Sequence, residues 1–211
     1  MKKSFAFTLT TALALCVSQV CQAAEKKNPE ANKLALEGAK AAKNQDFDKA
    51  VDLLKKAAAM DKKYTDELSA VYQQRGYAAA TNQQFQDAIN DYSEAAKLTP
   101  QNVRVYEQRA AVEMKIQDYD KALADYSEII KLKPNEVRYY NYRAYIYEIK
   151  NDIQNATAET ERALKLDPNN QEAKARKQRL EQKAANAAAN PTLTPPPALT
   201  PKPSPHGKKR P

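Results

Sequence analysis

The sequence predicts an all-α protein built from repeated helical hairpins. Only 3 of its 211 residues are glycine, well below the usual share of about 7%, whereas alanine, lysine, glutamate, glutamine and leucine are abundant. These residues favour helices, and the scarcity of glycine leaves little provision for the tight turns of a sheet. Each copy of a 34-residue repeat contains two stretches with the hydrophobic period of an α-helix.

Residues 1–23 have the pattern of a secretory signal peptide. Two early lysines precede an uncharged apolar centre, and no further charge occurs before Glu25. Small side chains predict cleavage after Ala23, with Ala24 as the alternative, and residues 24–30 then form a short linker. The other interpretation is an uncleaved anchor helix, although the stretch is short for a membrane span and contains several threonines and serines.

Both cysteines of the chain, Cys16 and Cys21, lie inside this N-terminal segment. Cleavage would leave a mature chain without disulfides, thiol catalysis or sulfur ligands for a metal. The short signal predicts an exported bacterial protein, either periplasmic or secreted.

Residues 31–170 contain four copies of the repeat. The strings "AAKLTP", "IIKLKP" and "ALKLDP" end at Pro100, Pro134 and Pro168, a constant step of 34. The copies cover about 31–64, 69–102, 103–136 and 137–170. The four residues Thr65–Leu68 separate the first copy from the second and are predicted to add one helical turn.

Each copy is predicted to form two antiparallel helices. In the second copy these are Ser69–Thr81 and Phe85–Lys97, and a proline ends the second helix because it cannot continue one. Side chains that can cap free backbone amides precede several helices. They are Asp46, Asp118 and Asp152 before second helices, and Asn102 and Asn170 before first helices.

The repeat resembles the tetratricopeptide repeat family. The resemblance covers roughly residues 31–170 and is carried by "YQQRGYAAATNQQFQDAINDYSEAAKLTP" and "YEQRAAVEMKIQDYDKALADYSEIIKLKP". It implies an α-solenoid of about four stacked hairpins with a concave groove that binds a peptide or a partner protein. The chain departs from the pattern at Leu54 and Thr160, which replace the aromatic residue found at Tyr92 and Tyr126.

Two further segments follow the repeats. Residues 171–188 are helical in composition and very polar, which predicts a capping helix for the open solenoid end. Residues 189–211 include eight prolines and the basic cluster Lys202, Lys208, Lys209 and Arg210. This composition predicts a disordered, Pro-rich basic tail.

Five tyrosines lie within nine residues of the fourth copy. At about 100° per residue, Tyr140 and Tyr147 fall on the stripe that faces the hairpin partner and are predicted to be core. Tyr139 is predicted to pack on the neighbouring repeat. Tyr142 and Tyr145 point the opposite way, so they either bind a ligand or merely cover exposed surface.

The resemblance places the groove on the non-core faces of the first helices. The predicted groove residues are Gln73, Gln74, Tyr77, Arg104, Glu107, Gln108, Arg138, Asn141, Tyr142 and Tyr145. Amides can pair with any peptide backbone, tyrosines offer rigid contact area, and arginines favour carboxylates. We therefore expect an extended, mildly acidic peptide with an apolar anchor near Tyr145.

An arginine and an acidic residue recur sixteen positions apart in three copies, and both are missing from the first. The pairs are Arg75 with Asp91, Arg109 with Asp125, and Arg143 with Glu159. Ion pairs within about 4 Å are expected between the two helices of each hairpin.

The sequence contains no set of residues that predicts an enzyme. The single histidine, His206, lies in the tail, so no catalytic triad or two-histidine metal site can form. No catalytic residue, cofactor or metal is predicted. The function predicted is a non-enzymatic protein-interaction scaffold of the bacterial envelope.

The alternative function is binding of an anionic polymer or envelope surface through the basic tail. The formal charge is +8, but most of it lies at the two ends, which argues against a nucleic-acid-binding surface on the repeats. Membrane contact is expected only through an uncleaved signal or the tail. The sequence leaves open the partner's identity and the oligomeric state.

Overall fold

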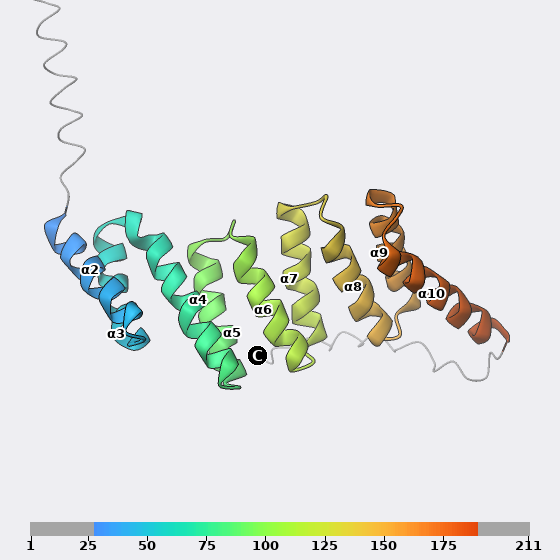
Figure 1. Ribbon diagram of the computed structural model, residues 1–211, viewed down its shortest axis with the longest axis horizontal. Coiled ribbons are helices and arrows are strands. Elements are labelled where there is room, and N and C mark those ends of the chain that lie inside the picture. Colours follow the sequence, from blue (N-terminus) through green and yellow to red (C-terminus); the bar gives the residue numbers. More distant parts are fainter. Residues whose placement is uncertain (1–27, 190–211) are drawn as a thin grey trace, which may run out of the picture. The chain divides into compact units, whose positions relative to one another are not determined.

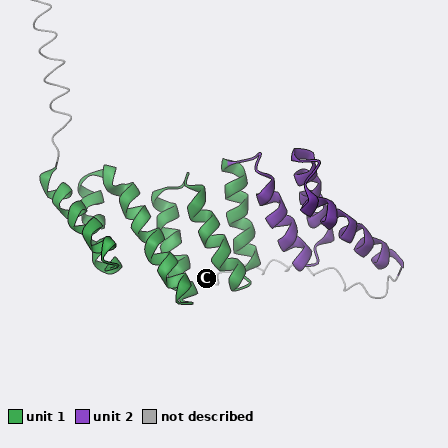
Figure 2. Ribbon diagram, viewed as in Figure 1, with its two compact units in different colours: residues 1–132 green, residues 133–211 purple. Residues whose placement is uncertain are grey.

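The computed structural model describes residues 28–189. The predicted signal peptide, its cleavage site and the Pro-rich segment 190–211 lie outside these residues. Within 28–189 the structure contains nine α-helices, one short 3-10 helix and no strand (Figure 1). The predicted all-α fold is therefore confirmed. The helices divide into two compact units, with the boundary between Leu132 and Lys133 (Figure 2).

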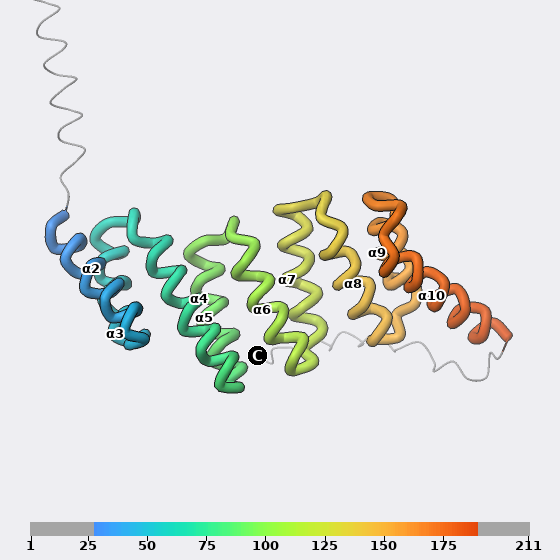
Figure 3. Tube along the Cα trace, viewed as in Figure 1, coloured from blue at the N-terminus to red at the C-terminus, as the bar shows by residue number. Residues whose placement is uncertain are grey.

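Unit 1 contains three antiparallel hairpins in chain order (Figure 3). The first pairs α2 (Pro29–Lys43) with α3 (Phe47–Met60), the second α4 (Thr65–Thr81) with α5 (Phe85–Leu98), and the third α6 (Val103–Lys115) with α7 (Tyr119–Leu132). The 3-10 helix η1 (Lys62–Tyr64) joins the first two hairpins. Consecutive hairpins stack, because α3 packs on α4 and α5 packs on α6.

Unit 2 contains one hairpin and the predicted capping helix. The hairpin pairs α8 (Val137–Ile149) with α9 (Ile153–Leu166), and α10 (Gln171–Ala189) packs mainly on α9. Helix α10 turns a narrow stripe inward, made of Ala173, Arg176 and Leu180. Its remaining faces are polar and exposed, as expected of a helix that ends a stack.

The predicted caps all form. Each of the five side chains accepts a hydrogen bond from a backbone amide in the first turn of its helix, at 3.0–3.4 Å. The predicted extra turn is also present: α4 has 17 residues, whereas α6 and α8 have 13 each. The four residues inserted before the second repeat therefore lengthen α4 at its N-terminus.

The turn inside every hairpin contains a residue with a left-handed backbone. Gln45, Gln83 and Gln117 have φ of 62°, and Asn151 has φ of 56°. A side chain in this region costs energy that glycine avoids. The recurrence at the same repeat position shows that the turn geometry imposes this conformation and that the chain tolerates the strain.

Small residues allow the two helices of each hairpin to approach closely. A Cβ added at Gly38 would lie 2.8 Å from Leu54 Cγ, and one added at Gly76 would lie 3.1 Å from a ring carbon of Tyr92. The later repeats have fully buried alanines, Ala110 and Ala144, at the same place. Position 54 therefore belongs to the core although it lacks the aromatic ring of the second repeat.

The tyrosine-rich helix α8 differs from the prediction. Tyr139 is fully buried, whereas Tyr140 and Tyr147 are only half-buried, so the prediction that the latter two form the core is wrong. Tyr140 instead donates from its hydroxyl to the Pro134 carbonyl at 2.8 Å, as Tyr106 of the preceding repeat does to Pro100 at 3.1 Å. This bond holds the ring along the hairpin edge, where part of it meets solvent.

Candidate functional site

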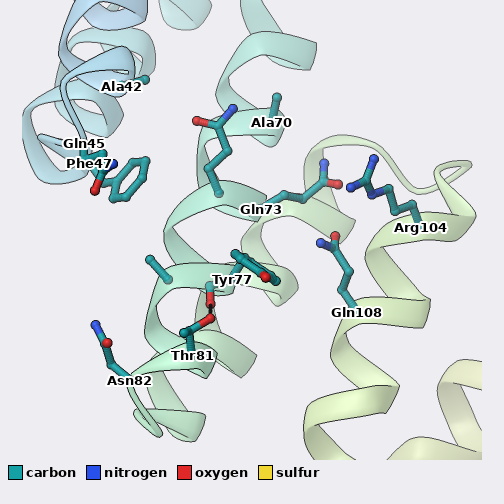
Figure 4. A pocket seen from close by; sticks show the side chains of 12 residues that line it. Ala42, Gln45, Phe47, Ala70, Gln73, Tyr77, Thr81, Asn82, Arg104 and Gln108 are labelled. Atoms are coloured by element: carbon teal, nitrogen blue, oxygen red, sulfur yellow. Dashed lines mark hydrogen bonds between the residues drawn. The ribbon is translucent and has the colours of Figure 1, made fainter.

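A pocket of about 740 Å³ lies on unit 1, against the first helices of its repeats (Figure 4). Five of the predicted groove residues line it. They are Gln73, Gln74 and Tyr77 from α4, and Arg104 and Gln108 from α6. Its opposite wall comes from the first hairpin and includes Ala42 and Phe47.

The pocket exposes hydrogen-bonding groups beside one aromatic ring. Tyr77 is 66% exposed. The Gln73 amide nitrogen donates to the Ser69 carbonyl at 3.3 Å, which leaves the Gln73 oxygen available to a ligand. The Gln108 side-chain oxygen is buried and accepts no hydrogen bond from the described part of the chain.

The lining residues of this pocket carry one positive charge and no negative charge. Arg104 is the cation, and its side chain points toward Gln73 and Gln108 in Figure 4. Glu107, the remaining predicted groove residue of unit 1, is half-buried and does not line the pocket. The pocket therefore favours an anionic or neutral ligand over a cationic one.

In unit 2, three apolar side chains share an exposed face of α8. Tyr142 is 46% exposed, Tyr145 is 45% exposed and Ile149 is 41% exposed. Their spacing of three and four residues places them on one helical stripe. Arg138, one turn before Tyr142, lies over the Tyr139 ring with its guanidinium carbon 4.6 Å from the ring centre.

Asn141 does not belong to this exposed face, so its predicted place in the groove is corrected. It is only 4% exposed, and its amide nitrogen donates to Asn170 at 3.1 Å. Its oxygen accepts from Arg176 of α10 at 3.5 Å. The capping helix therefore uses the amide that a ligand would need.

The capping helix is tied to α8 by one acidic residue, Glu148. Its carboxylate oxygens lie 3.1 Å from Arg179, 3.3 Å from Arg176 and 3.5 Å from Lys183. The hydrogen bonds from Arg179 lower the pKa of Glu148, which keeps this carboxylate ionised. Arg176 is 2% exposed, so its charge depends on this neighbour and on Glu172.

The predicted pairing of arginines with acids is confirmed in all three repeats. The shortest N–O distances are 2.6 Å for Arg75–Asp91, 2.6 Å for Arg109–Asp125 and 3.2 Å for Arg143–Glu159. In the first two pairs both carboxylate oxygens accept from the arginine. In the third, the Arg143 Nε and one Glu159 oxygen have no hydrogen-bond partner among the described residues.

Glu113 on α6 was not singled out by sequence reasoning. It is 2% exposed, and one of its oxygens has no hydrogen-bond partner in residues 28–189. Burial, followed by repulsion from Asp125, raises its pKa to about 7. The sequence did contain a signal. The same repeat position holds the uncharged residues Ala79 in the second copy and Tyr147 in the fourth, so a charged residue at position 113 departs from the pattern.

Two kinds of site are missing from residues 28–189. No group of three or more histidine, cysteine, aspartate or glutamate side chains is placed to hold a metal ion there. None of the described helices combines the length and apolar character that a membrane crossing requires.

Comparison with solved structures shows the same fold in other repeat proteins. A tetratricopeptide repeat protein from Parabacteroides merdae is 19% identical, with a TM-score of 0.55 over 76% of this chain and 62% of that one. MamA from Desulfovibrio magneticus is 19% identical, with a TM-score of 0.50 over 76% and 88% of the two chains. The Arabidopsis OM64 TPR domain is 30% identical, with a TM-score of 0.48 over 56% and 98%.

Comparison with sequences gives the family. No curated protein matches the chain. The pattern of the ETO1 C-terminal domain matches residues 33–185, which include all four repeats and most of the capping helix. The chain therefore belongs to the ETO1 C-terminal domain family and has the fold of the Parabacteroides merdae tetratricopeptide repeat protein.

Proposed function

We propose that this protein is an exported, non-enzymatic interaction scaffold of the bacterial cell envelope that binds an extended peptide or a segment of a partner protein. The observation that carries the proposal is the pocket on unit 1, where amides, one aromatic ring and one arginine face solvent. The exposed tyrosines of α8 provide a second contact surface on unit 2.

The chemistry of the pocket fits a peptide backbone. The Gln108 amide nitrogen can donate to a backbone carbonyl, whereas its oxygen is buried. Gln74 can bond to the same backbone from α4, since an amide offers both a donor and an acceptor. The Tyr77 ring supplies rigid contact area at small entropic cost.

The charge of the pocket favours a neutral or mildly acidic segment. Arg104 is its only lining cation, and a guanidinium binds carboxylates well. The open surface suits a contact on the order of 1,000 Å² or less, for which we expect micromolar or weaker affinity.

A peptide display library tests this proposal. Sequences enriched on the folded protein would be synthesised and their affinity measured by fluorescence anisotropy. We expect Tyr77→Ala and Gln108→Ala each to weaken binding about tenfold, equivalent to about 1.4 kcal/mol. Met60→Ala is the matched control, because Met60 is 50% exposed and does not line the pocket. Enriched peptides that bind the Tyr77→Ala protein with unchanged affinity would disprove this site.

Export is the second part of the proposal and has its own test. It is supported by the N-terminal pattern of two lysines and an uncharged apolar stretch. Mass analysis of the protein recovered from the periplasm or medium should give a mature start at Ala24. A protein that retains Met1 and stays in the cytoplasm would contradict export and leave the peptide-binding result unaffected.

A further inference from the structure

Helix α8 presents an exposed apolar stripe. Tyr142, Tyr145 and Ile149 are each more than 40% exposed, and they form one continuous apolar face. The other sides of α8 are occupied, because α9 packs along it and Glu148 is bonded to α10. A cluster of two aromatic rings and an isoleucine is unusual as plain surface.

Helix α10 contacts the last turn of α8 through Lys183. Lys183 Nζ lies 3.5 Å from a carboxylate oxygen of Glu148, which directly precedes Ile149 and follows Tyr145 by one turn. The helix ends at Ala189. The six residues after Lys183 add only about 9 Å of helix.

The chain that follows has the length to return to the stripe. Residues 195–199, with the sequence "PPPAL", begin six positions after Ala189. An extended proline-rich chain spans about 3.1 Å per residue, so these residues can lie roughly 19–31 Å from the end of α10. These distances exceed the length of about 9 Å by which α10 extends beyond Lys183.

The chemistry of the segment also fits. Residues 190–201 contain no charge, and the first cation after them is Lys202. Proline-rich segments dock on surfaces lined with aromatic rings, where the preformed extended helix loses little entropy on binding. The basic end of the chain begins beyond the docking segment and therefore need not approach the arginines of unit 2.

We propose that residues 195–199 bind the face formed by Tyr142, Tyr145 and Ile149 in the same chain and compete there with a partner peptide. The competition rests on the proposed function, whereas the docking itself does not. Because the segment is tethered nearby, its effective concentration is in the millimolar range, so even a weak contact is substantially occupied.

Nuclear magnetic resonance of the full chain tests the docking without any partner. The amide signals of Ala198 and Leu199 report on the segment, and a synthetic peptide of residues 190–201 gives their free positions. In the wild-type chain we expect both signals to differ from the peptide. In Tyr145→Ala we expect them to shift to the free positions. Tyr77→Ala, an exposed tyrosine of unit 1, should leave them unchanged.

A variant of the segment itself tests the docking without any change to the folded repeats. Pro195→Ser, Pro196→Ser and Pro197→Ser together should shift the amide signals of Tyr142, Tyr145 and Ile149 and leave those of unit 1 unchanged. Signals of Ala198 and Leu199 at the free positions in the wild-type chain would overturn the proposal. The proposal would also be overturned if Tyr77→Ala, and not Tyr145→Ala, moved these signals to the free positions. Shifts of the Ala198 and Leu199 signals that disappear on dilution would overturn it as well, because they would indicate binding between two copies.

Discussion

Arg109 donates two hydrogen bonds to Asp125, from Nε at 2.9 Å and from Nη2 at 2.6 Å, and its Nη1 donates to Ser93 of the preceding hairpin at 3.0 Å. One side chain thus connects both helices of its own hairpin to the neighbouring hairpin of unit 1. Burial raises the pKa of Asp125, so its charge depends on the arginine beside it.

Replacing Arg109 with leucine should strongly destabilise unit 1. The change leaves a buried carboxylate without its cation, which typically costs about 3–5 kcal/mol. Urea unfolding followed by circular dichroism measures the loss. The control is Lys97→Ala, which removes an exposed ion pair with Glu94 and should cost at most about 0.5 kcal/mol. Equal losses of stability in the two variants would show that the buried Arg109–Asp125 pair contributes no more than an exposed ion pair.

Shortening Glu159 to aspartate should stabilise unit 2. The first two arginines bind aspartates through both oxygens, whereas Glu159 leaves one oxygen and the Arg143 Nε without partners. An aspartate can reproduce the two-bond geometry, and we expect a gain of about 1 kcal/mol in the free energy of unfolding. The reciprocal change, Asp125→Glu, should lower stability. A loss on Glu159→Asp would mean that its bond to Arg162 matters more.

Glycine at the left-handed turn positions should stabilise the hairpins. Gln83 and Gln117 have φ of 62°, a conformation that costs a residue with a Cβ about 1 kcal/mol relative to glycine. Gln83→Gly and Gln117→Gly should each raise the urea midpoint, and their effects should add. Gln86→Gly, inside α5, is the control and should lower the free energy of unfolding by about 0.5–1 kcal/mol. A lower midpoint in both turn variants would refute the strain argument.

Stability should fall as pH rises through the titration of Glu113. Its pKa is about 7 in the folded chain, against an ordinary value of 4.5, so the folded state binds the proton more tightly. The stabilisation is fully present below about pH 4.5 and is lost as pH approaches 7, by up to about 3 kcal/mol. The groups around it are Asp125 and Asp118, which raise the pKa, and Arg109 and Lys121, which lower it.

Urea unfolding across this pH range checks the Glu113 prediction. Glu113→Gln keeps the shape of the side chain and removes its titration, so its stability should change much less between pH 4.5 and 7. Glu94→Gln, at an exposed ion pair, should keep the wild-type profile. Identical profiles for wild type and Glu113→Gln would show that other groups set the pH dependence.

The tyrosines of α8 should separate into a structural residue and surface residues. Tyr139 is fully buried, and Tyr139→Ala should cost about 3–5 kcal/mol because of the cavity that it leaves. Tyr145→Ala, at 45% exposure, should cost far less. Thermal unfolding compares the two. A similar loss of stability at both positions would place Tyr145 in the core and remove it from the proposed binding surface.

The repeat period made much of the architecture predictable from sequence. Because each copy repeats the same contacts, the caps and the Arg–acid pairs followed from spacing alone, and so did the extra turn before α4. Burial within α8 was harder to predict, since Tyr139 and Tyr140 are neighbours and only the packing decides which ring is covered.

The candidate site was predictable only in part. Gln73, Gln74 and Tyr77 of α4 and Arg104 and Gln108 of α6 were predicted from the faces that the repeat leaves outside the core, but other lining residues of α4, such as Ala70 and Thr81, were not. Phe47 was not predicted to line the pocket, because nothing about its repeat counterpart Phe85 indicated a position in a pocket wall. Asn141 was misplaced because its partners are distant in sequence: Asn170 is the last residue of the same repeat, and Arg176 belongs to the capping helix.

Two of the paired arginines, Arg75 and Arg109, also bond to the hairpin that precedes their own. Arg75 reaches Asp48 at 2.7 Å and Arg109 reaches Ser93 at 3.0 Å, so each uses an acceptor at a different position of its predecessor. If the third hairpin were joined directly to the first, the repeat register would place Lys55 where Arg109 now meets Ser93. Arg75 already lies beside Lys55 in this way, with both cations over the Tyr72 ring, and bonds to Asp48 instead. A version of this chain from which the second hairpin is excised should therefore still stack, with Asp48 taking over as the acceptor of Arg109.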